Sequence, residues 1–330
     1  MGIFLGMLLA GVLLLTPSQS SYAATQPFDA WLATLRVEAL RQGVSQSLVA
    51  EALPDTLKPN DRILRLDRQQ PEGAVSFERY KSNVITADRV RKGRNHMRRH
   101  QVLLKQIGDA YGVEPEYIVA LWGIETNFGE NMGGYETIPA LVTLAYDGRR
   151  GEFFRKELLK ALKIVDQGHI GLREMKGSWA GAMGQCQFMP TSFENHARDH
   201  NKDGRRDIWK TEADVFASTA AYLSESGWQE DKPLKRLVRL PKDFDNKLIG
   251  FYIQKPLQFW QEAGIRLLNG ADLPMDTEEQ VSILQPGGAG YKAYVVYNNY
   301  RILIKWNTSS YFATAVGLFA DQLKMGYERG

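Results

Sequence analysis

The chain has 330 residues, which is long enough for two modest domains or one lobed domain, and its 44% apolar and 24% charged residues exclude wholesale disorder. Its 41 basic and 38 acidic side chains leave a net charge of only +3, which argues against a nucleic-acid-binding protein. A single cysteine, Cys186, excludes an intramolecular disulfide framework, and five histidines without an HExxH or HxH pair leave little for a zinc enzyme.

The first 24 residues have the pattern of an export signal. The apolar run over 3–15 is too short to span a bilayer comfortably but matches the core of a signal peptide. Ser21 and Ala23 are small residues at the spacing of a cleavage site. We therefore expect a signal peptide over 1–24, cleaved near Ala23, and a mature protein that works outside the cytoplasm. No Lys or Arg precedes the run, so an uncleaved membrane anchor is the alternative, and no cysteine follows it to carry a lipid.

The next part of the chain, residues 25–112, has the pattern of a helical lobe. Apolar residues recur at three- and four-residue spacing over 28–112, interrupted by Pro54, Pro59 and Pro71. Within this lobe lies a run of basic side chains, which is either a solvated helix face or a surface that steers an anionic polymer. These side chains are Arg89, Arg91, Lys92, Arg94, Arg98 and Arg99.

The following helical segment, from Pro115 to Gly129, contains a glutamate on its apolar face. A proline suits the first turn of a helix, and a glycine suits its end. Spacings of three, four and seven residues place Glu125 on the apolar stripe, in the last turn. Poor hydration and the negative end of the helix dipole both disfavour a charged carboxylate, so we expect a raised pKa and an acid able to donate a proton. The alternative is a structural glutamate neutralised by a buried arginine. The apolar members of the stripe are Ile118, Leu121, Trp122 and Phe128.

A glycine-rich stretch over 177–190 surrounds Gln185 and Gln187 with small residues. Small residues let the backbone approach another surface closely, and the side-chain amides together with Ser178 can hydrogen-bond a polar ligand such as a sugar. The stretch is therefore a candidate binding surface. The alternative is a tightly packed junction before the next helix.

That helix, which Thr191 and Glu194 would open as a capping box, leads into a loop over 199–214 that resembles an EF-hand calcium loop. Oxygen-bearing side chains occupy loop positions one, three, five and nine, and a glycine occupies position six. Lys210 stands at position twelve, where a bidentate glutamate is usual, but Asp214 follows closely and could close the site. The alternative is an Asx-rich turn between two helices. The candidate calcium ligands are Asp199, Asn201, Asp203, Arg205 and Asp214.

From residue 234 the pattern changes from helix to short strands. Apolar and β-branched residues gather in four short segments, which turn-forming residues separate. We expect a small β-containing subdomain over 234–306 and a return to helix over 308–327. The four segments are 237–240, 281–284, 294–297 and 301–304.

These motifs, in this order, resemble those of the membrane-bound lytic murein transglycosylase B family. The resemblance covers about 28–327, nearly the whole mature chain. The chain departs from the family pattern at Lys210 and carries no cysteine placed to hold a lipid. The motifs that carry the resemblance are ALWGIETNFG at 120–129, GAMGQCQFMP at 181–190, the loop over 199–209 and WNTSSY at 306–311.

The resemblance implies a mainly α (α+β) fold and a location in the periplasm. It divides the chain into a signal peptide, an N-terminal helical lobe, a lysozyme-like catalytic core, a small β subdomain and a C-terminal helix that returns to the core. The corresponding ranges are 1–24, 25–112, 113–233, 234–306 and 307–330.

The resemblance also implies an enzyme that cleaves the β-1,4 bond between N-acetylmuramic acid (MurNAc) and N-acetylglucosamine (GlcNAc) in peptidoglycan without water, leaving 1,6-anhydro-MurNAc ends. Glu125 matches the family's single acid/base, which the substrate's own N-acetyl group would assist. Arg149 and Arg150 match basic positions that face the stem peptide or the muramic carboxylate. The chemistry needs no cofactor, and any Ca²⁺ would be structural. The residues that match the lining of the glycan groove are Ser178, Gln187, Tyr222, Asn307 and Tyr311.

Peptidoglycan glycan strands are the implied partner of a monomeric chain, with cell-wall synthase or division proteins as further candidates. Two other functions stay open. A muramidase would use the same groove with water as the nucleophile, and a wall-binding, calcium-stabilised scaffold would have no catalysis at all.

Overall fold

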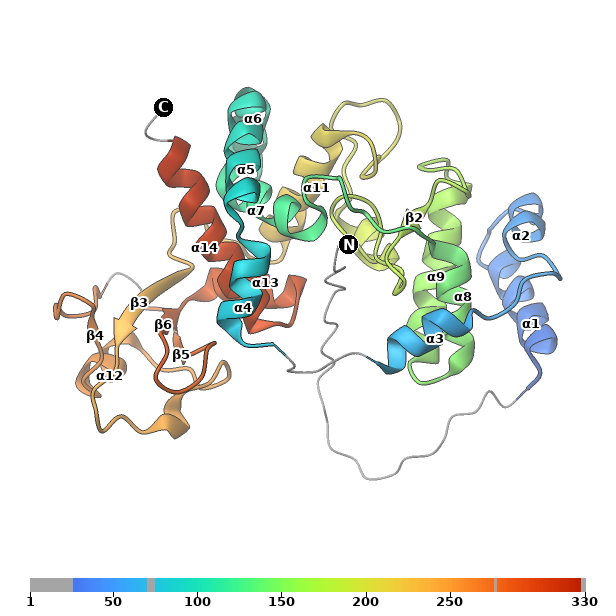
Figure 1. Cartoon of the computed structure of the whole chain (residues 1–330). Helices are drawn as coiled ribbons and strands as arrows, with labels where there is room; N and C mark the ends of the chain where they lie inside the picture. Colours follow the sequence, from blue (N-terminus) through green and yellow to red (C-terminus); the bar gives the residue numbers. More distant parts are fainter. Residues whose placement is uncertain (1–25, 70–74, 276–277, 328–330) are drawn as a thin grey trace. The chain divides into compact units, whose positions relative to one another are not determined.

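The computed structural model describes residues 26–69, 75–275 and 278–327 (Figure 1). The expected signal peptide over 1–24 lies outside these residues. Within the described ranges, none of the helices combines the length and the hydropathy that a membrane span requires. The chain forms two compact units, which we describe separately: unit 1 contains 75–120 and 223–327, and unit 2 contains 26–69 and 121–222. Helices α1 to α6 all lie within 28–112, as predicted, and are divided between the two units.

Unit 2 is built around the antiparallel pair α8 and α9, which share the most extensive helix–helix contact of the described structure. The side chains of Phe154, Leu158 and Leu162 recur at four-residue spacing along α9 and are at most 1% exposed, because this stripe faces α8. Gly148 has a φ of 81° and ends α8 in the left-handed conformation that favours glycine. The elements of unit 2 are α1 (Phe28–Arg41), α2 (Gln46–Ala52), α3 (Asp61–Arg68), β1 (Tyr135–Glu136), α8 (Thr137–Asp147), α9 (Gly151–Asp166), β2 (Lys176–Gly177) and α10 (Pro190–His196), with the second part of α7 (Pro115–Thr126) and most of α11 (Glu212–Glu225).

The capping box predicted at the start of α10 is wrong. The helix begins at Pro190 after Met189, whose side chain makes no capping hydrogen bond. The backbone N–H and the hydroxyl of Thr191 instead donate 2.8 Å hydrogen bonds to the two carboxylate oxygens of Glu157 on α9. Glu157 is 3% exposed, and burial raises the pKa of its carboxyl above the ordinary value. A carboxylate from another helix therefore satisfies the donors that a local cap would have satisfied.

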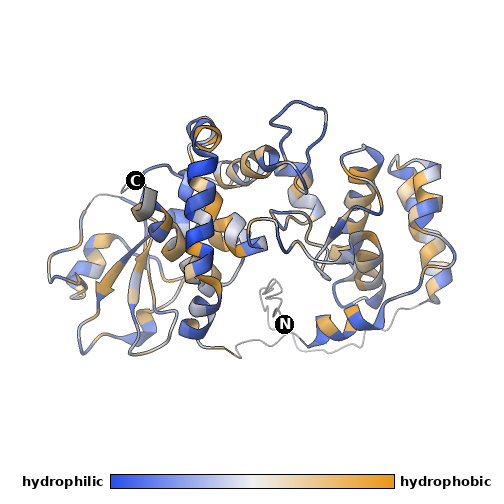
Figure 2. Ribbon diagram, turned by 45° about the horizontal axis from the view of Figure 1, so that its top comes forward, coloured by the Kyte–Doolittle hydropathy of each residue, from blue (hydrophilic) through white to orange (hydrophobic). Residues whose placement is uncertain are grey.

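Unit 1 combines helices with a four-stranded antiparallel sheet in the order β4-β3-β6-β5. Leu237 pairs with Tyr294 between β3 and β6, and Ile283 pairs with Val295 between β5 and β6. Every residue of β5 and β6 is buried, and Figure 2 shows hydrophobic stretches among the strands of this sheet. The elements of unit 1 are α4 (Phe77–Val84), α5 (Ala87–Arg99), α6 (Gln101–Tyr111), the first part of α7, β3 (Lys235–Arg239), the 3₁₀ turn Asn246–Leu248, α12 (Leu257–Glu262), β4 (Arg266–Leu267), β5 (Ser282–Leu284), β6 (Ala293–Val296), α13 (Asn298–Trp306) and α14 (Ser310–Tyr327).

Three of the four predicted strand segments are strands, but the fourth, 301–304, lies in the middle of α13. Four consecutive residues of mixed apolar character cannot distinguish a strand from a buried helix by periodicity. The residues that decide the outcome precede the segment. Asn299 is 1% exposed and donates hydrogen bonds to the carbonyl oxygens of Gln229 and Lys232, which anchors the first turn of the helix. The predicted return to helix over 308–327 is confirmed by α14, and the mainly α fold is confirmed as a whole.

Candidate active site

Helix α7 carries the candidate acid, Glu125. The helix begins at Pro115, as predicted, and ends at Thr126. Trp122 and Phe128 on the predicted stripe are 1% and 7% exposed, whereas Glu125 is half-buried. Its carboxylate is close enough to contribute to the electrostatics of the buried Cys186, whose thiol pKa rises to about 12, chiefly because of burial. The acid thus lies at the edge of an apolar interior, where a side chain can be both poorly hydrated and accessible.

The backbone after α7 makes an abrupt left-handed turn. Asn127 and Phe128 have φ values of 53° and 63°, and Gly129 follows at 83°. The first two are non-glycine residues in a conformation that side chains rarely adopt, so the surrounding structure must hold them there. Part of that restraint is the hydroxyl of Thr126, which accepts a 3.0 Å hydrogen bond from the backbone N–H of Gly129.

Gln185 joins this helix end to the glycine-rich stretch. Its side-chain Oε1 accepts a 2.7 Å hydrogen bond from the indole N–H of Trp122, and its backbone carbonyl accepts a 3.0 Å bond from the hydroxyl of Thr126. Its side-chain Nε2 donates 2.9 Å to the carbonyl oxygen of Trp209, and its backbone N–H donates 2.8 Å to that of Ile208. Gln185 is 7% exposed, so this is a buried bridge between α7 and the end of the loop over 199–210.

Close backbone contacts explain the glycines that surround the bridge. A Cβ on Gly133 would lie 2.1 Å from the carbonyl oxygen of Gly177, and a Cβ on Gly177 would lie 2.0 Å from that of Ala182. Both distances are far inside van der Waals contact, so these positions admit no side chain. The prediction that small residues allow close backbone approach is confirmed at this junction.

Unit 2 also contains three of the predicted sugar-binding residues. Gln187 is 8% exposed, and its Nε2 donates to the carbonyl oxygens of Met132 (3.0 Å) and Gly184 (2.9 Å), which leaves Oε1 as its hydrogen-bonding atom toward other groups. The hydroxyl of Ser178 accepts a 3.1 Å bond from the backbone N–H of Ala182 and is half-buried.

Tyr222 is the third of these residues, on α11. Its ring lies 4.7 Å from that of His196 and 5.8 Å from that of Phe188, and burial raises the pKa of its hydroxyl to about 12, so the phenol stays protonated. The other two predicted groove residues belong to unit 1. Asn307 ends α13 and accepts a 3.0 Å bond from Ser309, and the ring of Tyr311 on α14 packs against aromatic rings of α4.

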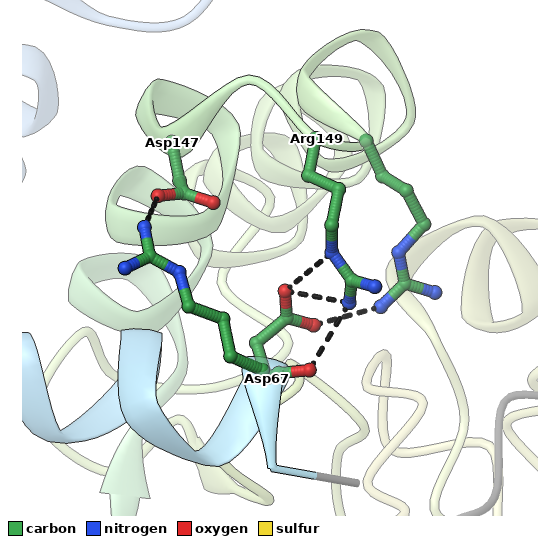
Figure 3. Close-up of polar contacts among 5 residues, drawn as sticks. Asp67, Asp147 and Arg149 are labelled. Atoms are coloured by element: carbon green, nitrogen blue, oxygen red, sulfur yellow. Dashed lines mark hydrogen bonds and ion pairs between the residues drawn. The ribbon is translucent and has the colours of Figure 1, made fainter. Parts of the chain in front are cut away.

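The arginines predicted to face an anionic part of the substrate meet a buried aspartate of α3 (Figure 3). Asp67 is 3% exposed, and its carboxylate lies 2.6 Å from Nη2 of Arg149 and 3.1 Å from Nη2 of Arg150. A separate ion pair joins Asp147 to Arg68 at 2.7 Å. Arg149 keeps half of its side chain exposed, so part of its guanidinium still faces solvent while Asp67 fixes its position.

The loop over 199–214 has much of the geometry of a calcium loop. Lys202 and Gly204 have φ values of 61° and 89°, and the glycine at position six makes the sharp turn that this loop type needs. The carboxylate of Asp199 accepts hydrogen bonds from the backbone N–H groups of Asp203 (3.1 Å) and Gly204 (2.9 Å), which curls the loop around it. Asn201 and Asp203 add further oxygen atoms to the same turn. This hard-oxygen donor set suits Ca²⁺.

Lys210 and Asp214, at the far end of the loop, make contacts that differ from those of the corresponding residues of an EF-hand. The side-chain ammonium of Lys210 lies 2.6 Å from Glu174. Asp214 is fully buried, and its two carboxylate oxygens accept 2.8 Å hydrogen bonds from the backbone N–H groups of His200 and Asp207. The side-chain carboxylate of Asp214 therefore ties the two ends of the loop together by binding backbone N–H groups of His200 and Asp207.

Residues 27–321 match the family described as the transglycosylase SLT domain, which is most of the chain. The chain belongs to this family. Over 296 residues this transglycosylase is 30% identical to the membrane-bound lytic murein transglycosylase B of Escherichia coli (strain K12), covering 84% of this chain and 77% of the relative. The predicted family, the mainly α lysozyme-like fold and the assignment as a lytic transglycosylase enzyme are confirmed.

Solved structures resemble the transglycosylase over nearly its whole length. SltB3 from Pseudomonas aeruginosa, crystallised with NAG-anhNAM-pentapeptide, is 41% identical with a TM-score of 0.86, covering 91% of this chain and 80% of SltB3. Slt35 from Escherichia coli, crystallised with calcium, is 27% identical with a TM-score of 0.81, covering 93% of this chain and 96% of Slt35.

The sequence did not predict the structural roles of two residues of the transglycosylase that shape the site, Gln185 and Asp67. Gln185 was one of two glutamines in the glycine-rich stretch, and nothing local distinguished the buried bridge from Gln187. Asp67 lies four residues after the buried Ile63 on α3, so the same helical spacing that drew attention to Glu125 would have found it.

Proposed function

We propose that this lytic transglycosylase cleaves the β-1,4 MurNAc–GlcNAc bond of peptidoglycan without water, with Glu125 as the only acid/base. The observation that carries the proposal is the position of Glu125, half-buried at the end of α7 beside the buried Gln185 bridge. A carboxyl group in such surroundings can hold a proton and can be held in one orientation. A second carboxylate, which most glycosidases use, is not required if the substrate supplies its own nucleophile.

The reaction proceeds in two steps. Glu125 donates its proton to the glycosidic oxygen, the C1–O bond breaks, GlcNAc leaves as an alcohol, and the carbonyl oxygen of the N-acetyl group of MurNAc bonds to C1. Glu125, now a carboxylate, then takes the proton of the C6 hydroxyl, and the C6 oxygen bonds to C1 as the acetamido oxygen leaves. The acid is regenerated, and a 1,6-anhydro ring closes with no water consumed. A hydroxyl held at C1 outcompetes water because its effective concentration is high.

The roles of the remaining residues follow from their chemistry. Ser178, Gln187 and Tyr222 carry hydrogen-bonding atoms suited to sugar hydroxyl and acetamido groups, and we retain Asn307 and Tyr311 as further glycan-binding positions. The SltB3 ligand contains an anhydro-MurNAc unit and a pentapeptide, which supports both the anhydro product and a stem-peptide role for Arg149 and Arg150. We also propose export to the periplasm, where the substrate lies.

Calcium is proposed as a structural ion of the loop. The oxygen atoms of Asp199, Asn201 and Asp203 and the backbone carbonyl of Arg205 would hold it, and Asp214 would support the loop from behind. An ion there would stiffen the segment that continues to Trp209 and, through Gln185, to α7. The calcium complex of Slt35 supports this assignment.

The test is the mass of the products from purified sacculi. Anhydro muropeptides are one water lighter than hydrolysis products, and Glu125→Gln should abolish their release while leaving the fold intact. Products with reducing ends alone would replace the proposal with a muramidase. Unchanged loss of sacculus turbidity in the Glu125→Gln variant would remove Glu125 from the mechanism.

A further inference from the structure

The basic run predicted over 89–99 forms α5, and one face of this helix borders a groove. Arg91, Arg94 and Arg98 follow one another at three- and four-residue spacing, so they project from the same side of the helix. Helix α5 packs on α14 within unit 1 (Figure 1), and Gln322 of α14 lines the same groove. The groove has a volume of about 460 Å³. The predicted alternatives were a solvated face and a surface for an anionic polymer, and a concave groove favours the second.

The lining of the groove is basic and lacks acidic side chains. Arginines make up three of the seven lining residues, all within the described part of the chain, and none of the seven carries a carboxylate. Ala87 and Val90 add an apolar patch, and Asn95 adds an amide. The nearest acid along α5, Asp88, pairs with Arg91 from outside this lining. The net charge of the whole chain is only +3, so this concentration of positive charge is local.

Hydrogen bonds hold the three guanidinium groups in place but use only some of their N–H donors. Arg94 donates from Nε and Nη2 to the carbonyl oxygen of Gln322, at 3.1 and 2.8 Å, which fixes it against α14. Nη2 of Arg91 bonds Asp88, and Nη2 of Arg98 bonds the side-chain oxygen of Asn95. Each guanidinium carries five N–H donors, so among the described residues most of the donors along this face have no protein acceptor. A row of partly held guanidinium groups is suited to carboxylates, which they can bind through two parallel hydrogen bonds.

We propose that this groove is a second binding site for peptidoglycan, and that it takes the carboxylates of peptide stems. The proposal rests on the proposed function, which brings the protein to a polymer whose stems carry free carboxylates. Three guanidinium groups along about 10 Å of helix, two turns, would meet the carboxylates of one stem in sequence. Concave shape argues against a flat lipid surface, which would be met by a protruding face. The site would hold the enzyme on the mesh while the active site works on a glycan strand.

The test separates binding from catalysis. In the inactive Glu125→Gln background, binding to purified sacculi is measured by sedimentation for the double variant Arg91→Ala/Arg98→Ala. The matched control is Arg41→Ala/Arg65→Ala, which removes two exposed arginines from α1 and α3 and the same net charge. Thermal unfolding of each variant checks that the fold is unchanged.

The groove variant should bind sacculi about fivefold more weakly than its parent, whereas the control should change by less than about twofold. On glycan strands stripped of their peptides by an amidase, the groove variant and its parent should bind equally. Equal losses in the two double variants, or a loss that persists on stripped strands, would overturn the proposal. Groove-dependent capture of phosphatidylglycerol vesicles without any loss on sacculi would overturn it in favour of lipid. Failure of the proposed function would instead appear as absent anhydro products from the wild-type protein.

Discussion

Replacing Gln185 by alanine should destabilise the protein by about 3 kcal/mol. The change removes the acceptor of the Trp122 indole N–H (2.7 Å) and the donor to the carbonyl oxygen of Trp209 (2.9 Å). Trp122 and Trp209 are 1% and 4% exposed, so water does not readily replace the lost partners. A buried group left without its partner costs about 1–3 kcal/mol, and the cavity adds to this unless a water enters it.

The same change should lower the turnover number more than the Michaelis constant. Trp122 lies three residues before Glu125 and Thr126 lies next to it, so the bridge holds the helix turn that carries the proposed acid. Loosening this turn would misplace the proposed proton donor, and a misplacement of about 1 Å costs on the order of a hundredfold in rate. Urea unfolding measures the stability, and initial rates on sacculi, well below the melting temperature, measure the turnover.

The control is Asn299→Ala in unit 1, which removes another buried amide. Asn299 donates to the carbonyl oxygens of Gln229 (2.7 Å) and Lys232 (3.3 Å), so the loss of stability should be comparable. Its turnover should stay within about threefold of wild type, because its bonds do not reach α7. A Gln185→Ala protein that loses under about 1 kcal/mol, or that turns over as fast as the control, would refute the reasoning.

Three further predictions concern the same unit. Gly177→Ala should cost several kcal/mol, about 3 or more, because its Cβ would lie 2.0 Å from the carbonyl oxygen of Ala182, whereas Gly134→Ala, which meets nothing within 4 Å, should cost little in the same thermal unfolding assay. Burial raises the pKa of Glu157 above its ordinary value of 4.5, so as the pH rises this carboxyl loses its proton in the unfolded chain before it does in the folded protein. The free energy of unfolding should therefore fall as the pH rises from the ordinary pKa to the raised one. Glu157→Gln should flatten the plot of melting temperature against pH in this interval, and an unchanged slope would contradict a raised pKa for Glu157. Chelation should lower the melting temperature without changing the product masses; no shift, with no metal by elemental analysis, would end the calcium proposal.

Local features of the fold could be predicted because their causes are local. Pro115 begins α7 because its missing N–H and fixed φ suit a first turn. Gly204 takes a φ of 89° because position six of the loop needs it. The strand predicted over 301–304 was wrong because its helical conformation depends on Asn299, whose hydrogen bonds go to residues some 70 positions earlier. The capping box at Thr191 failed for a similar reason, since Glu157 supplies its acceptors from another helix.

In the candidate site, too, local features could be predicted from the sequence and distant partners could not, as two carboxylates show. Glu125 and Asp67 both lie at helical spacing from buried apolar residues, and spacing alone does not distinguish a proton donor from a structural carboxylate neutralised by arginine. At Asp67 the second outcome holds, because α8 and α9 are joined by the turn that carries Arg149 and Arg150. The partner that decides lies 82 positions away in the sequence, and helical periodicity contains no information about it. An apolar stripe therefore marks a carboxylate whose charge is costly, and the distant segment that the fold brings to it decides whether that charge is neutralised. For Glu125 that segment is the glycine-rich stretch, whose backbone admits close approach and whose Gln185 holds the turn in place.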